Sequence, residues 1–113
     1  MKDDLIYLEH IKEFCEDLLF YLYEIKDFEE FRKNKLYQDA VIRKLKIIGE
    51  ASNYISQRLK KEYPKIPWAE TKGMRNRLIH AYFGVNLNLV WEVLIKKIPK
   101  LNKEINQIIK DKN

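Results

Sequence analysis

Polar residues suited to acid–base and phosphate chemistry lie close together in the segment 67–82. His80 and Asn76 are four residues apart, which places both on one side of a helix. An imidazole titrates near neutral pH, so His80 is well suited to accept and donate protons. The guanidinium of Arg75 can form several hydrogen bonds to an anionic group. The segment therefore carries the residue types that acid–base chemistry at a phosphate needs.

These residues lie apart from the apolar stripe of the same segment. At about 100° per residue, the side that faces a core is formed by Thr71, Met74, Leu78, Ala81 and Tyr82. Asn76 and His80 lie on the opposite side, and Arg75 and Ile79 form the flank between the two. A solvated helix face is expected to carry Lys or Glu there, so either this polar pair beside an aliphatic residue has a task, or His80 is a surface or hydrogen-bonded side chain without one.

Other residues that often carry chemistry receive structural interpretations. We interpret His10 as structural and Cys15, in an apolar stripe, as a small core residue. Trp68 and Trp91 are expected in the core or an interface, and Glu50 either pairs with an arginine of segment 67–82 or is exposed. Neither a glycine-rich phosphate loop nor a metal-binding histidine pair occurs, which argues against nucleotide hydrolysis, metal catalysis and a bound cofactor.

Apolar residues recur at three- and four-residue steps along the chain, which predicts helices. Four are expected, over residues 4–25, 36–59, 67–82 and 86–109. Asp3 and Asp4 can cap the first, Pro67 suits the first position of the third, and Asn86 can cap the fourth. Pro99 lies inside the fourth, so either one rod is kinked there or two helices stack with a shared face. We expect an all-α antiparallel bundle of four to five helices in a single domain over residues 1–113.

The composition agrees with a helical domain. A length of 113 residues suffices for one core, and three glycines and three prolines leave little material for the turns of an all-β fold. The single cysteine cannot close an intramolecular disulfide, which favours a reducing cytoplasm. Apolar runs fall far short of the ~20 residues that span a bilayer, and no signal-peptide core follows Met1, so no membrane association is expected.

Positive charge is concentrated in the second half of the chain. Residues 1–57 carry nine Lys or Arg and twelve Asp or Glu, whereas residues 58–113 carry thirteen and five. Seven of these bases lie within twenty residues, namely Arg58, Lys60, Lys61, Lys65, Lys72, Arg75 and Arg77. The cluster either attracts phosphates or acidic partners, or is a solvated lysine-rich surface.

The run from Gly73 to Val85 resembles the signature of the HEPN superfamily, an arginine, four residues and a histidine. It is similar, more narrowly, to the HepT-like toxin family, which adds a tyrosine two places after the histidine. Arg75, His80 and Tyr82 match all three positions. Asn76 matches the polar residue that often follows the arginine. Further landmarks of the family lie at residues 47–51, 66–68, 90–91 and 98–99.

This resemblance implies the toxin of a toxin–antitoxin system, a metal-independent endoribonuclease that cleaves RNA as a homodimer. Such cleavage uses the neighbouring 2′-hydroxyl as nucleophile, so one group must take its proton and another must protonate the leaving 5′-oxygen. One chain offers a single candidate, His80. Two copies of the segment meeting across a twofold axis, with Ile79 as an apolar contact, would supply two imidazoles. Arg75 would hold the scissile phosphate and stabilise its transition-state charge.

The resemblance also implies a regulated tyrosine. In the family, a minimal nucleotidyltransferase antitoxin modifies the tyrosine at the position of Tyr82 with AMP. The added phosphate would obstruct RNA beside His80 and compete for Arg75. One departure is Ala81, where many relatives have an acidic residue. If that acid orients the histidine or holds the partner, this chain does so differently or less well.

The remaining assignments concern RNA contacts and the alternative function. Asn76 either orients the histidine or the ribose, or is an ordinary helix-surface asparagine. Arg77 and Lys72 are expected to contact RNA. The alternative to an enzyme is a non-catalytic module with the same fold that docks a nucleotidyltransferase or RNA without cutting it.

Overall fold

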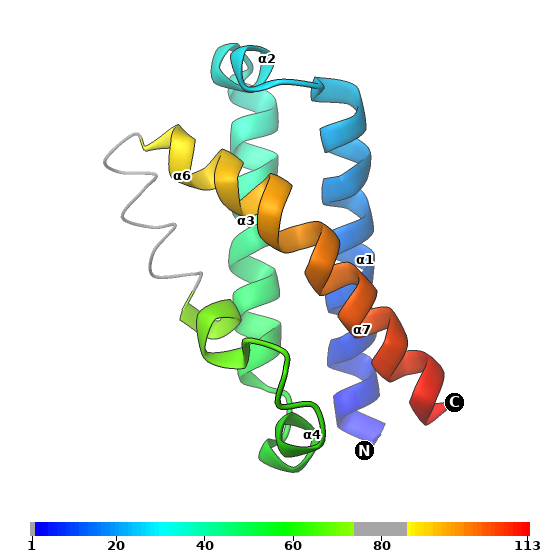
Figure 1. The fold of residues 1–113 in the computed structure, drawn as a ribbon. Coiled ribbons are helices and arrows are strands. Elements are labelled where there is room, and N and C mark those ends of the chain that lie inside the picture. The colour runs from blue at the N-terminus through cyan, green and yellow to red at the C-terminus, as the bar shows by residue number, and fades with distance from the viewer. Residues whose placement is uncertain (1, 74–85) are drawn as a thin grey trace.

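The regular structure of the protein is helical throughout the part that the computed structural model describes, residues 2–73 and 86–113. Helix α1 (Lys2–Ile25) and helix α3 (Lys35–Asn53) run side by side in opposite directions (Figure 1). The main contacts of α1 are with α3 and with α7 (Ile98–Lys112), which crosses in front of α1 in Figure 1. The predicted all-α bundle is thus confirmed. No helix in the described ranges is both long and apolar enough to cross a membrane.

The predicted apolar stripe of α1 forms one wall of the core. Its fully buried residues are Leu8, Ile11, Cys15 and Leu18. The first turn differs from the expectation, because α1 begins at Lys2, so Asp3 and Asp4 lie inside the helix instead of capping it. Asp4 is only 3% exposed, and its carboxylate accepts hydrogen bonds from the backbone N–H (2.8 Å) and the hydroxyl (2.6 Å) of Ser56. Asp4 therefore ties the start of α1 to the far end of α3.

Replacing Asp4 by alanine is expected to lower the free energy of unfolding by about 2–3 kcal/mol, because two hydrogen bonds to a buried carboxylate are lost. Asp3, the exposed neighbour in the same first turn, provides the control. Asp3→Ala removes the same charge and is expected to cost less than about 1 kcal/mol. Urea denaturation followed by circular dichroism measures both values. Equal losses would show that the Ser56 contacts contribute nothing beyond helix electrostatics.

The polar interruption expected between the first two helices contains a helix of its own, α2 (Phe28–Lys33). The side chain of Asp27 caps it by accepting from the N–H of Glu30 at 2.9 Å. Phe31 is fully buried, with its ring 5.4 Å from that of Trp91. Because only one turn and a half forms, the segment offers too few apolar repeats for a period to be recognised from the sequence.

The second predicted helix is wrong in its length, since α3 ends at Asn53 and α4 (Gln57–Glu62) follows as a separate helix. Ser56 starts α4, because its hydroxyl oxygen accepts from the N–H of Leu59 at 3.1 Å while Ser56 donates to Asp4. The apolar period continues across the break, since both Ile55 and Leu59 are buried. Leu36, expected on the buried face, is 78% exposed at the start of α3.

The last predicted helix forms one continuous rod, with an irregularity just before Pro99 (Figure 1). It consists of α6 (Leu87–Glu92), a π-helical segment η1 (Val93–Lys97) and α7. The N–H of Ile98 donates to the carbonyl of Val93, five residues back, so the chain is locally wider than an α-helix. Pro99 then lies in the first turn of α7, where its missing N–H costs little. Ile95, expected to be buried, is 39% exposed.

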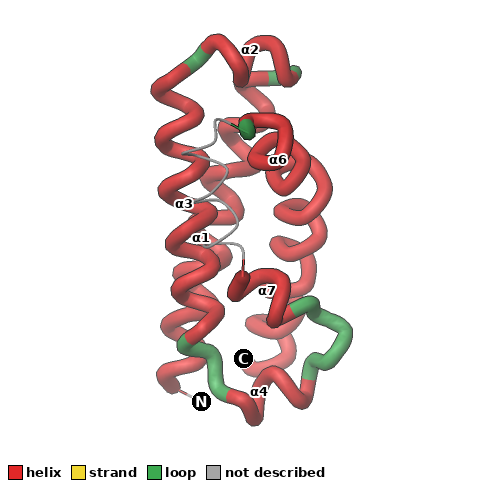
Figure 2. The backbone as a smooth tube through the Cα atoms, turned by 90° about the vertical axis from the view of Figure 1, so that its left-hand side faces the viewer, coloured by secondary structure: helices red, strands yellow, loops and turns green. Residues whose placement is uncertain are grey.

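The C-terminal end of α7 is fastened to α4. The hydroxyl of Tyr63 donates to Asp111 at 2.9 Å, and the ammonium of Lys112 donates to Glu62 at 2.6 Å. Both chain ends therefore lie at the same end of the bundle as α4, as Figures 1 and 2 show. The fold holds α4, and the segment that follows it, against the core.

Candidate functional site

The residues of the predicted catalytic motif lie outside the described part of the chain. These are Arg75, Asn76, Arg77, His80 and Tyr82, which fall between Gly73 and Asn86. Their assignments remain predictions from the sequence. The structure does describe the residues that lead into the motif and those that follow it.

The residues that lead into the motif are fixed on the core. Helical structure covers residues 68–73, so Pro67 precedes the helix instead of being its first residue. The carbonyl of Pro67 accepts from the N–H (2.9 Å) and the hydroxyl (3.1 Å) of Thr71. Trp68 is 9% exposed, and its indole N–H donates to the carbonyl of Tyr63 at 3.0 Å. Thr71 and Trp68 are thus buried, as the sequence predicted.

The chain after the motif is fixed in the same way. The side chain of Asn86 caps α6 by accepting from the N–H of Leu89 at 3.2 Å, which confirms the predicted cap. Val90, one turn into α6, is fully buried, and Trp91 packs on Phe28 and Phe31. Both sequence neighbours of the motif are therefore anchored to one hydrophobic core.

The described members of the basic cluster surround α4 and residues 68–73. Lys72, a predicted RNA contact, is exposed, as are Arg58, Lys61 and Lys65. Lys60 is half-buried, with its ammonium nitrogen 5.9 Å from the centre of the Trp68 ring. Burial lowers the pKa of Lys60, and the positive charge of Lys72 lowers it further, while Asp4 acts in the opposite direction. Most of the cluster is therefore solvated surface, whereas Lys60 contacts the ring of Trp68.

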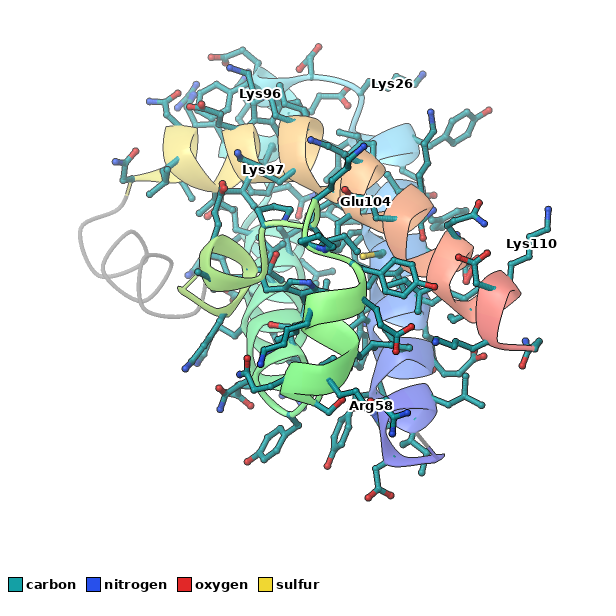
Figure 3. The ribbon with its side chains drawn as sticks, turned by 60° about the horizontal axis from the view of Figure 1, so that its bottom comes forward. Lys26, Arg58, Lys96, Lys97, Glu104 and Lys110 are labelled. Atoms are coloured by element: carbon teal, nitrogen blue, oxygen red, sulfur yellow. The ribbon has the colours of Figure 1, made fainter. Side chains whose placement is uncertain are left out.

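A groove of about 180 Å³ lies on another side of residues 68–73, facing η1 and α7. Its charged lining comprises Lys65, Lys97, Lys100, Glu70 and Glu104. Lys97 and Glu70, which both line it, form an ion pair at 2.6 Å, and Figure 3 shows Lys97 and Glu104 on the rod formed by α6, η1 and α7. Because acids and bases alternate here, the groove lacks the concentrated positive charge of a phosphate site.

Three other residues that often carry chemistry lie outside the motif, on α1 and α3. His10 is exposed on α1, with its ring edge-on to Tyr7 at 6.5 Å. Cys15 is fully buried, and burial raises the pKa of its thiol to about 12, so it is a core residue and not a nucleophile. Glu50 is exposed on α3.

Comparison with known proteins decides the family. A family model described as Ribonuclease HepT-like matches residues 5–108. The chain belongs to the HepT-like ribonuclease family. The match spans α1 to α7 and includes the whole motif, so the resemblance seen in the sequence is confirmed.

Individual relatives align with this chain over nearly their whole length. A protein of Caldanaerobacter subterraneus subsp. tengcongensis, named a putative RNase, is 42% identical over 109 residues, 96% of each chain. A putative RNase of Methanocaldococcus jannaschii is 46% identical and covers 89% of this chain and 92% of its own. A probable ribonuclease HepT of Thermococcus cleftensis is 44% identical, with coverages of 92% and 94%. No solved structure matches the chain.

Proposed function

We propose that the chain is a metal-independent endoribonuclease that acts as a homodimer, with Arg75 and His80 as its catalytic residues. The observation that carries the proposal is the spacing of Arg75, His80 and Tyr82 within a chain that belongs to the HepT-like ribonuclease family. The relatives' names, which describe ribonucleases, support the same activity.

The proposed reaction is an intramolecular transesterification. A neutral imidazole of His80 takes the proton of the ribose 2′-hydroxyl, and the 2′-oxygen attacks the adjacent phosphorus. The bond from phosphorus to the 5′-oxygen breaks as a protonated imidazole gives its proton to that oxygen. The products are a 2′,3′-cyclic phosphate and a free 5′-hydroxyl. Arg75 binds the phosphate oxygens, whose negative charge increases in the transition state.

A dimer supplies the two imidazoles that this reaction uses. His10, the only other histidine, lies on α1 and contacts Tyr7, apart from the motif in sequence. We propose that two copies of the motif segment meet across a twofold axis, so that one His80 is the base and the other is the acid. Asn76 would orient an imidazole or the ribose, and Arg77 and Lys72 would bind RNA phosphates.

The regulation that we propose is the addition of AMP to Tyr82 by a minimal nucleotidyltransferase antitoxin. In the sequence, Tyr82 follows His80 by two residues and precedes Gly84 by two. A phosphate ester on its hydroxyl would add negative charge and bulk beside the RNA site. The chain would then be the toxin of the pair, switched off by covalent modification.

Two measurements on the purified chain test activity and assembly together. Single-stranded RNA incubated in EDTA is expected to be cut, and sedimentation equilibrium is expected to give twice the 13.8 kDa chain mass. A monomer that cuts RNA would contradict the two-histidine arrangement. A dimer that binds RNA and never shortens it would instead favour the non-catalytic binding module.

A further inference from the structure

Two lysines from different helices lie near Trp68. Trp68 and Lys72 are four residues apart, so they are neighbours on one face of the helical stretch 68–73. Lys60 reaches the same indole from α4, with its ammonium nitrogen 5.9 Å from the ring centre. Trp68 is buried and its indole N–H donates to the carbonyl of Tyr63, so the ring beside the Lys60 ammonium is held in place.

This pair of positive charges lacks a neutralising carboxylate. Within residues 2–73 and 86–113, ion pairs hold seven other basic residues, and none holds Lys60 or Lys72. Asp4 favours the charged form of Lys60, but both of its carboxylate oxygens already accept hydrogen bonds from Ser56. Two like charges thus repel each other, one on the half-buried Lys60 and one on the exposed Lys72.

The repulsion between the two lysines costs free energy, and a bound anion would remove that repulsion. Burial lowers the pKa of Lys60 and the charge of Lys72 lowers it further, so the folded chain holds a repulsive pair. A phosphate between the two ammonium groups would accept charge-assisted hydrogen bonds from both and cancel the repulsion. The contact of the Lys60 ammonium with the indole restricts this side chain before binding, so less side-chain entropy is lost when an anion binds.

We propose that Lys60 and Lys72 form a subsite for the RNA backbone, which binds phosphates away from the scissile bond. The inference rests on the proposed ribonuclease function and adds Lys60 and Trp68 to it. Lys72 precedes Arg75 by three residues, so the subsite lies at the entrance of the motif in the sequence. Its role is to hold the RNA strand along α4 and residues 68–73, and it takes no part in proton transfer.

The test compares the binding of a 2′-O-methyl oligoribonucleotide of about 15 uridines, which lacks the free 2′-hydroxyl needed for cleavage. The double variant Lys60→Gln, Lys72→Gln is measured against wild type by fluorescence anisotropy between 0.05 and 0.5 M salt. Losing two phosphate contacts should reduce the slope of log K against log salt by about 1.4. The same slope predicts about 25-fold weaker binding at 0.1 M salt.

A matched control removes two lysines from α7. Lys103 and Lys110 are exposed on that helix, and Figure 3 shows Lys110 pointing away from α4. Lys103→Gln, Lys110→Gln lowers the net charge equally and is expected to weaken binding less than threefold. The variant Lys60→Arg, Lys72→Arg keeps both charges and is expected to bind like wild type. Circular dichroism establishes that all variants are folded.

The outcomes separate this inference from the proposed function. If wild type binds and the Lys60 and Lys72 variant binds equally well, or no worse than the α7 control, the subsite is wrong while the ribonuclease assignment stands. If wild type does not bind RNA at all, the proposed function and the subsite fall together. Cleavage of an ordinary RNA by a variant with weakened binding supports the subsite, since the chemistry then survives its loss.

Discussion

Replacing His80 by alanine is expected to reduce RNA cleavage by at least about 10²–10⁴-fold, the range typical of losing a general acid or base. In the proposed dimer one substitution removes both imidazoles, so the loss should fall at the upper end. Alanine favours helix, and the predicted core stripe of the segment lies on the opposite side, so the fold should persist. The rate of cleavage of a fluorescent RNA in EDTA measures the effect.

His10 provides the matched control for this variant. It is the other histidine of the chain and is exposed on α1, so His10→Ala should fold and cleave at the wild-type rate. Growth of a bacterial host after induction should be inhibited by wild type and His10→Ala and restored by His80→Ala. A folded His80→Ala protein with undiminished cleavage would remove His80 from the mechanism.

Substituting Tyr82 by phenylalanine is expected to abolish AMP addition while retaining most of the ribonuclease activity. Only the hydroxyl is removed, and this is the atom that would be esterified. It is not expected to act in catalysis, because two residues along a helix turn a side chain about 200° away from His80. Intact-mass measurement after co-expression with the proposed nucleotidyltransferase should show added AMP on wild type and none on the variant.

An exposed tyrosine at the end of α3 supplies the control for that experiment. Tyr54 is 64% exposed, so Tyr54→Phe tests whether any accessible tyrosine is modified. It should carry the same AMP addition as wild type and remain neutralised. Neutralisation of wild type without a change in mass would mean that the antitoxin acts by covering the site, and the tyrosine switch would be wrong.

The helices with long apolar periods could be predicted from the sequence. Apolar residues recur over many turns in α1 and from Val90 to Ile109, so the burial of one helix face determines the structure there. Asn86 and Thr71 were also predictable, because capping and the core stripe depend on residues within one turn. The family followed from the spacing of Arg75, His80 and Tyr82 together with the landmarks that flank them along the chain.

Features that depend on distant contacts could not be predicted. The break between α3 and α4 is stabilised by Asp4, 52 residues away from Ser56, and the apolar period gives no sign of it. The π-helical segment η1 before Pro99 depends on which backbone carbonyl accepts from the N–H of Ile98. The residue types do not specify that choice. In the sequence Lys60 is only one base of a cluster. Its position over Trp68 could not be predicted, because it depends on α4 folding back beside residues 68–73.

The chemical nature of the ends left by cleavage tests the central claim most directly. RNA is incubated with the wild-type chain in EDTA, and the fragments are weighed by mass spectrometry beside those from His80→Ala. The proposed mechanism predicts 2′,3′-cyclic phosphate and 5′-hydroxyl ends from wild type, and no fragments from the variant. Fragments with 5′-phosphate ends, or cleavage that stops when EDTA is added, would contradict a metal-independent ribonuclease that uses the 2′-hydroxyl as nucleophile.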